Sequence, residues 1–258
     1  MNIGFFDSGV GGTTILKKAL KEINGDFFYL ADNKNAPYGV KEKNKVKEYS
    51  FKAVETLLKR NCKIIVIACN TATSVAIKEI RQKYNNIIFI GTEPAVKLAK
   101  KSFNGKRILV TATTITINGR KLLNLVDQLS IKEYVDMLAL DKLVEYAENG
   151  NVDKETINRY LYSKLKAYDL NKYSHIVLGC THFPLLKDNF NTVIPSTIKL
   201  LDSSEGVVRN LKKQLKLFNY NTNEYDPKIN LLLSKKDINF INNFKNIIEN
   251  KNVNVEII

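Results

Sequence analysis

The sequence is poor in the residues that build disulfide frameworks and metal sites. Its 258 residues contain only three cysteines, Cys62, Cys69 and Cys180, and two histidines, His175 and His182. An odd, sparse cysteine count excludes a disulfide scaffold and is typical of a reducing compartment, where thiols stay free. There is no Cys-x-x-Cys or His-x-x-x-His spacing, so no metal site is predicted.

Long apolar runs are also missing. None reaches the roughly 20 residues that a helix needs to span a bilayer. The segment Met1–Asp7 passes directly into a strand-like run, without a basic region or a cleavage site, so no signal peptide is predicted. We therefore expect a cytoplasmic protein that has no membrane partner.

Acidic residues are fewer than basic ones: the chain has 26 Asp and Glu but 40 Lys and Arg, which gives a formal net charge of +14. Such a charge attracts anions, whether nucleic acid or small carboxylates. The lysines are spread along the chain, however, and Tyr and Phe fall mostly at apolar periodic positions where they cannot stack on bases. The composition therefore argues against a nucleic-acid partner, which we keep only as a weaker alternative.

Short apolar runs alternate along the chain with amphipathic stretches. Most of the runs are rich in β-branched or aromatic residues and apolar on both faces, as strands of a covered parallel sheet must be. The alternation predicts an α/β fold with mainly parallel sheets. Strands are predicted at 3–6, 27–30, 64–68, 87–90, 108–110, 135–138, 176–178, 229–233 and 253–258, with helices at 46–59 and 153–167.

Two segments share one template. Residues 65–71 and 176–182 each consist of an apolar strand, a small residue, a cysteine and two polar residues. This repetition predicts two pseudo-equivalent α/β units that face each other. Because the chain after about residue 206 again contains a helix, a strand and a helix, we expect it to complete the first domain. The predicted boundaries are 1–95 plus 207–258 for the first domain and 96–206 for the second.

The paired cysteines indicate a specific chemistry. Ligands of open α/β sheets bind beyond the carboxyl ends of the strands, where Cys69 and Cys180 lie, each directly before an expected helix start. The free N–H groups and the dipole of a helix N-terminus lower the pKa of a thiol. Two thiols on opposite faces of a substrate can invert a stereocentre through a carbanion, provided that fixed donors stabilise the charge. Such a reaction needs no cofactor. Cys62 lies outside the template and is assigned to packing.

Other strand ends also carry candidate site residues. Residues 6–14 form a glycine-rich turn whose amides can approach an anion, although their spacing is not that of a nucleotide-binding loop. A Pro-Tyr-Gly loop follows the second strand, and a cluster of threonines follows another strand. His182 can act as a proton partner for Cys180, whereas His175 is expected at the surface.

Taken together, these segments resemble the glutamate racemase family of the aspartate/glutamate racemase superfamily. The resemblance runs in order over nearly the whole chain, and the Thr-His-Phe-Pro sequence favours the glutamate branch. The motifs that carry it are Phe6-Asp7-Ser8-Gly9-Val10-Gly11-Gly12, Pro37-Tyr38-Gly39, Ala68-Cys69-Asn70-Thr71-Ala72, Glu93-Pro94-Ala95 and Leu178-Gly179-Cys180-Thr181-His182-Phe183-Pro184.

The resemblance implies two pseudo-symmetric, three-layer α/β domains with the active site in the cleft between them. It also implies cofactor-independent interconversion of L- and D-glutamate, in which Cys69 and Cys180 exchange the α-proton. Asp7 would assist Cys69, His182 would assist Cys180, and Glu148 would be an additional acidic group near the second cysteine. The resemblance further implies a homodimer that supplies D-glutamate for peptidoglycan in a bacterial cytoplasm. Glutamate would be held by Asp7, Ser8, Tyr38, Gly39, Asn70, Thr71, Thr116, Thr181 and His182.

The chain departs from the family pattern at a few positions. Ala112 replaces a usual glycine, Gly119 a serine, and Leu140-Asp141 a Cys-Pro pair. These departures weaken the assignments of Thr116 and Glu148 but not those of the cysteines. An aspartate or hydantoin racemase remains the alternative, and the second cysteine argues against a single-cysteine decarboxylase.

Overall fold

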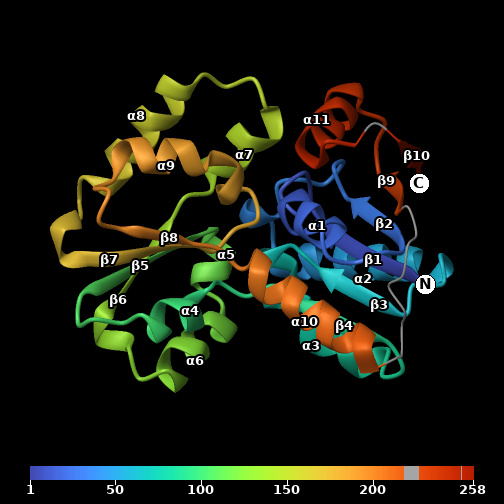
Figure 1. Cartoon of the computed structure of the whole chain (residues 1–258), viewed down its shortest axis with the longest axis horizontal. Coiled ribbons are helices and arrows are strands. Elements are labelled where there is room, and N and C mark those ends of the chain that lie inside the picture. The colour runs from blue at the N-terminus through green and yellow to red at the C-terminus, as the bar shows by residue number, and fades with distance from the viewer. Residues whose placement is uncertain (218–226, 251) are drawn as a thin grey trace.

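The computed structural model describes residues 1–217, 227–250 and 252–258, and its strands form two separate sheets (Figure 1). In the first sheet every neighbouring pair of described strands is parallel. Its spatial order is β10 (Val253–Ile257), β9 (Lys228–Leu233), β2 (Asp26–Ala31), β1 (Asn2–Asp7), β3 (Ile64–Ile67) and β4 (Ile88–Gly91). The late strands β9 and β10 therefore extend a sheet that the first part of the chain begins.

The second sheet is also parallel throughout its described strands. It is built from one continuous stretch of the chain, in the order β6 (Val135–Ala139), β5 (Arg107–Ala112), β7 (Tyr173–Leu178) and β8 (Lys199–Leu201). The two parallel sheets confirm the predicted α/β class.

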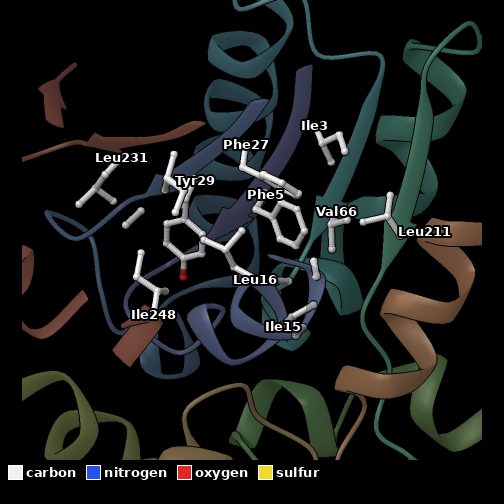
Figure 2. Packing of buried hydrophobic residues seen from close by; sticks show 14 of the residues in the cluster. Ile3, Phe5, Ile15, Leu16, Phe27, Tyr29, Val66, Leu211, Leu231 and Ile248 are labelled. Carbon is white, nitrogen blue, oxygen red and sulfur yellow. The ribbon is translucent and has the colours of Figure 1, made fainter. Parts of the chain in front are cut away.

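Helices cover both faces of the first sheet. One face packs against α1 (Thr13–Leu20), α10 (Ser204–Leu217) and α11 (Ile238–Ile248), and the other against α2 (Lys43–Lys59) and α3 (Asn70–Lys83). Figure 2 shows the first of these cores, where Phe5, Phe27 and Tyr29 from the sheet meet Leu16 and Ile248 from the helices. Burial of such large apolar side chains supplies the main driving force for folding.

The second sheet is covered in the same way. Helices α7 (Lys142–Asn149), α8 (Lys154–Leu165) and α9 (Lys187–Val193) lie on one face, and α4 (Val96–Lys101) and α6 (Arg120–Gln128) on the other. Short helical segments complete the connections: η1 (Tyr38–Val40), α5 (Thr114–Ile117), η2 (Lys132–Tyr134), η3 (Leu170–Lys172) and η4 (Phe183–Leu186).

No helix of the described residues is both long and apolar enough to cross a membrane. The helix predicted at 46–59 is α2, which begins slightly earlier, at Lys43. The last predicted strand, at 253–258, is β10, an edge strand that pairs with β9.

Candidate active site

Cys69 lies two residues beyond the end of β3, in the first sheet. Ala68 donates its backbone N–H to the carbonyl of Phe6 at 2.8 Å, so the chain remains beside β1 up to this point. The helix α3 starts at the next residue, and the Cys69 sulfur caps it by accepting the backbone N–H of Ala72 at 3.4 Å. The thiol therefore sits at the carboxyl edge of the sheet, next to Asp7 at the end of β1.

Cys180 has the same offset in the second sheet, two residues beyond the end of β7. Gly179 donates its backbone N–H to the carbonyl of Thr111 at 2.7 Å, which keeps this segment beside β5. The expected helix start directly after Cys180 is wrong: the 3-10 segment η4 begins at Phe183, and α9 begins only at Lys187. Pro184 near the start of η4 favours a tight turn here.

The expectation that the helix N-terminus would lower the thiol pKa is wrong for Cys69. The pKa of Cys69 is raised to about 12, because burial and, to a smaller extent, the charges of Asp7 and Cys180 outweigh the lowering by the bonds with Ala72 and Ser8. Desolvation of the thiolate outweighs the helix N–H groups because the side chain is only 5% exposed. The Ser8 hydroxyl lies 3.7 Å from the sulfur.

Asp7 connects the two cysteine segments. Its Oδ1 accepts the backbone N–H of Gly9 at 2.9 Å, and its Oδ2 accepts the Thr181 hydroxyl at 3.0 Å. The carboxyl group is fully buried. Burial raises its pKa from 3.8 to about 6, although the neighbouring His182 works in the opposite direction. Asp7 is therefore poised to change its protonation state near neutral pH.

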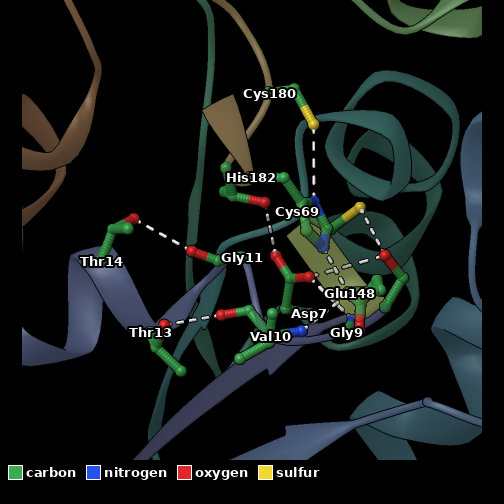
Figure 3. A network of polar contacts seen from close by, with 12 residues as sticks. Asp7, Gly9, Val10, Gly11, Thr13, Thr14, Cys69, Glu148, Cys180 and His182 are labelled. Carbon is green, nitrogen blue, oxygen red and sulfur yellow. Dashed lines mark hydrogen bonds and ion pairs between the residues drawn. The ribbon is translucent and has the colours of Figure 1, made fainter. Parts of the chain in front are cut away.

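His182 lies between Cys180 and Glu148 (Figure 3). Its Nδ1 is 3.6 Å from the Cys180 sulfur, and its Nε2 makes a very short contact with Oε1 of Glu148. Burial alone would lower the pKa of His182, but the Glu148 carboxylate and the Cys180 sulfur outweigh it and raise the pKa well above its ordinary value. The structure thus brings Glu148 to the second cysteine, as the resemblance implies.

The glycine-rich turn after β1 packs tightly against the second cysteine segment. A Cβ atom on Gly9 would lie 1.6 Å from Oε1 of Glu148, and one on Gly11 would lie 2.6 Å from the Thr181 hydroxyl. The backbone N–H of Val10 donates to the same Glu148 oxygen at 2.8 Å. Only glycine lets the turn approach so closely.

Three threonine hydroxyls form a short chain between the two sheets. Thr71 in α3 lies 2.9 Å from Thr113, which in turn lies 3.0 Å from Thr116 in α5, measured between hydroxyl oxygens. All three side chains are buried. Asp141, where the family pattern has proline, caps α5 by accepting the backbone N–H of Thr114 at 3.0 Å and its hydroxyl at 2.6 Å.

Asn70 has spare hydrogen-bonding capacity. Its Nδ2 donates to the carbonyl of Thr92 at 3.2 Å, but among the described residues its buried Oδ1 has no partner. A buried acceptor without a partner is costly, and it can accept a donor from a bound ligand. The Tyr38 hydroxyl, in contrast, is already engaged by Oδ2 of Asp32 at 2.7 Å.

Sequence reasoning missed Asp32, which is buried and accepts bonds from both Tyr38 and Asn35. It directly follows the end of β2, the same signal that identified Asp7 at the end of β1. The expectation that His175 is at the surface is wrong: the ring is 2% exposed and bonds to the hydroxyls of Ser102 and Ser174. Cys62 is buried against α2 and the first sheet, as expected for packing.

No three His, Cys, Asp or Glu side chains in the described part of the chain are grouped so that they could hold a metal ion. The groups brought together are instead two thiols, two carboxylates, one imidazole and several hydroxyls. This set suits proton transfer at a small polar ligand.

The family model described as Asp/Glu/Hydantoin racemase matches residues 12–211. A glutamate racemase of Halothermothrix orenii is 49% identical over 216 residues, which is 83% of this chain and 85% of the relative. Glutamate racemase 2 of Bacillus subtilis is 47% identical over 218 residues, 83% and 82% of the two chains.

The fold is also similar to that of a solved glutamate racemase. The crystal structure of glutamate racemase isoform RacE1 from Bacillus anthracis superposes with a TM-score of 0.88 at 25% identity and covers 99% of this chain and 96% of that one. The chain therefore belongs to the Asp/Glu/Hydantoin racemase family, among its glutamate racemases.

Proposed function

We propose that this enzyme interconverts L- and D-glutamate without a cofactor, and that Cys69 and Cys180 act as the two bases. One thiolate removes the α-proton, the C–H electron pair remains on the substrate as a carbanion, and the other thiol delivers a proton to the opposite face. The roles reverse with the direction of the reaction.

The observation that carries this proposal is the matched placement of the two sulfurs. Each lies two residues beyond the end of a strand, one strand in each sheet, and each has its own polar partners. Ser8 contacts Cys69 and links it to Asp7, and His182 contacts Cys180 and links it to Glu148. A single base would tend to return the proton to the face from which it came.

The remaining predicted residues are suited to hold the substrate. The free Oδ1 of Asn70 can accept the α-ammonium group, and the hydroxyls of Thr71, Thr116 and Thr181 can donate to carboxylates. Ser8 and Gly39 complete the set on the side of the first sheet. Tyr38 would contribute mainly by shape, because its hydroxyl is held by Asp32.

We also propose domain boundaries, an oligomeric state and a cellular role for the enzyme. We place the domain boundaries near residues 95/96 and 206/207, where the chain leaves the first sheet after β4 and returns to it with α10. The enzyme would act as a homodimer in the cytoplasm and supply D-glutamate for peptidoglycan.

The direct test is circular dichroism of L- or D-glutamate incubated with the purified enzyme, without added pyridoxal phosphate or metal. Both enantiomers should converge on one racemic mixture. Cys69→Ser and Cys180→Ser should each nearly abolish racemisation, whereas Cys62→Ser, the matched buried thiol outside the site, should not. Full racemase activity in both site variants would refute the two-base mechanism.

A panel of L-aspartate, hydantoins and L-glutamate separates the proposed substrate from those of related racemases. Glutamate should be the preferred substrate. Preference for aspartate or a hydantoin would retain the chemistry but reassign the substrate.

A further inference from the structure

Two buried side-chain oxygens lack a hydrogen-bond partner among the described residues: Oδ1 of Asn70 and Oγ1 of Thr92. The two residues are 4% and 1% exposed. Asn70 is the first residue of α3, and Thr92 directly follows the end of β4. Native proteins rarely leave such atoms unpaired, so each requires a partner from outside the chain or a functional reason. Two of them on adjacent segments indicate a shared site for a small hydrogen-bonding molecule.

The neighbouring hydrogen-bonding groups are already engaged. Nδ2 of Asn70 donates to the carbonyl of Thr92 at 3.2 Å, and this bond fixes the orientation of the amide. The backbone N–H of Thr92 is shared between the carbonyl of Ile67 at 3.2 Å and the hydroxyl of Thr73 at 3.1 Å. The Asn70 oxygen and the Thr92 hydroxyl do not bond to each other. A molecule placed between them can therefore satisfy both without breaking an existing bond.

Asn70 and Thr92 line one small cavity of about 10 Å³, which we call the α3–α6 cavity. Its wall also includes Thr116 from α5 and Leu122 and Leu125 from α6, so it lies where the two halves of the molecule meet. This volume is close to the smallest space that holds one water molecule, and a buried water needs at least two polar partners. The cavity is too small for glutamate or another organic ligand, so water is the molecule that fits.

We propose that one water molecule in the α3–α6 cavity bridges the Thr92 hydroxyl and Oδ1 of Asn70, and that Thr92 thereby acts as a positioning residue for Asn70. The inference rests on the proposed function, in which Asn70 helps to hold glutamate. The water accepts the hydroxyl hydrogen of Thr92 and donates one of its own to Oδ1. A carbonyl oxygen has two lone pairs, so Oδ1 can accept the water and still accept the α-ammonium group of the substrate.

The thermal stability of Thr92→Val separates a bridged hydroxyl from an unpaired one, because valine has nearly the same shape but no hydroxyl. With the water bridge, the substitution removes a partner of the water, and Tm should fall by about 2–4 °C, as for the loss of about one hydrogen bond. With an unpaired hydroxyl, the substitution would remove the cost of burying it, and Tm would rise. Thr111→Val is the reference, since that hydroxyl donates to the carbonyl of Val177 at 3.0 Å and its loss should also lower Tm.

Steady-state kinetics test the positioning role. Thr92→Val should raise KM for glutamate about fivefold and change kcat less. Thr92→Ser keeps the hydroxyl and should keep KM near the wild-type value. Thr111→Val, the matched control, should leave KM unchanged although it also lowers stability. In an Asn70→Ala background, Thr92→Val should have no further effect on KM, because Thr92 acts only through Asn70.

A crystal structure of the enzyme should show the water within hydrogen-bond distance of both oxygens. A site without that water, or a rise in Tm for Thr92→Val, would overturn the bridge. An unchanged KM in Thr92→Val, or equal KM changes in Thr92→Val and Thr111→Val, would overturn the positioning role even with the water in place. An enzyme that does not racemise glutamate would overturn the proposed function, and with it the positioning role, whereas the crystal structure and the Tm values would still decide whether the water is bound.

Discussion

The Thr181 hydroxyl donates to Oδ2 of Asp7 at 3.0 Å, and this bond joins the segment that carries Cys180 to the strand end beside Cys69. Because Asp7 also accepts the N–H of Gly9, the carboxylate is held in one position. The same carboxylate is thus both a local partner of the first thiol and a link to the second half of the site.

Asp7 should make the stability of the enzyme depend on pH. Its pKa in the folded enzyme, about 6, is above the ordinary 3.8, so the folded state binds the proton more tightly. The contribution of Asp7 to the free energy of unfolding is therefore complete below about pH 4 and lost as the pH rises through 6, a change of about 3 kcal/mol. Urea denaturation of the wild type and of Asp7→Asn measures this effect. The free energy of unfolding of the wild type, relative to that of Asp7→Asn, should be higher at about pH 4 than at about pH 7.5.

The control for Asp7 is Asp153→Asn. Asp153 caps α8 at the surface, and its bonds from Thr156 lower its pKa, so the sign is opposite. A stability difference between wild type and Asp7→Asn that does not change with pH would contradict the assignment.

Gly9→Ala should remove most of the activity. The new methyl group would occupy the position of Oε1 of Glu148 and push that carboxylate away from His182. We expect kcat to fall about a hundredfold or more, the usual effect of disturbing a general acid–base partner. Gly206→Ala is the matched control because a Cβ there meets nothing within 4 Å. It should keep full activity and gain about 0.5–1 kcal/mol of helix stability, and equal losses in both variants would refute the steric explanation.

Thr113→Val should weaken substrate binding. The hydroxyl links Thr71 in α3 to Thr116 in α5, so its loss frees both neighbours that we expect to face the substrate. Steady-state kinetics should show KM for glutamate raised about tenfold with a smaller change in kcat, as for the loss of about one hydrogen bond. Thr111→Val is the control, since that buried hydroxyl bonds to Val177 within the second sheet. An unchanged KM in Thr113→Val would exclude a positioning role.

Asp141→Ala should affect kinetics through the position of α5. It removes the bonds to Thr114 and should cost about 1 kcal/mol of stability. Asp153→Ala removes the N-cap of α8, far from the site, and should also lower stability. Only Asp141→Ala should also raise KM, because α5 carries Thr116. Chemical denaturation and initial-rate measurements on both variants would distinguish these effects.

The strands of both sheets could be predicted because the pattern of apolar residues along the chain shows directly which strands are buried. Strand β3, with four buried apolar residues, could hardly form anything but a central strand. The late return of β9 to the first sheet was also expected, because the chain after about residue 206 again contains a helix, a strand and a helix. Asp7, Cys69 and Cys180 could be found because strand ends in parallel sheets converge at one edge.

Other features depend on tertiary contacts that no local pattern reveals. The pKa of Cys69 reflects desolvation by both halves of the molecule, which outweighs the local helix N–H groups. His175 looked like a polar residue at the start of a strand, but Ser102 at the end of α4 covers and bonds to it. Asp32 is bonded to Tyr38 only because the loop after β2 folds back over the strand end.

The order of strands in the first sheet bears on synthesis of the chain. During synthesis, β2 can pair with β1 on one side, but its other edge stays unpaired until β9 has been made. An unpaired parallel strand offers a template for misassociation. The second sheet, built from a continuous stretch, can be complete before that edge is closed, so chaperone protection should matter most until the last thirty or so residues emerge.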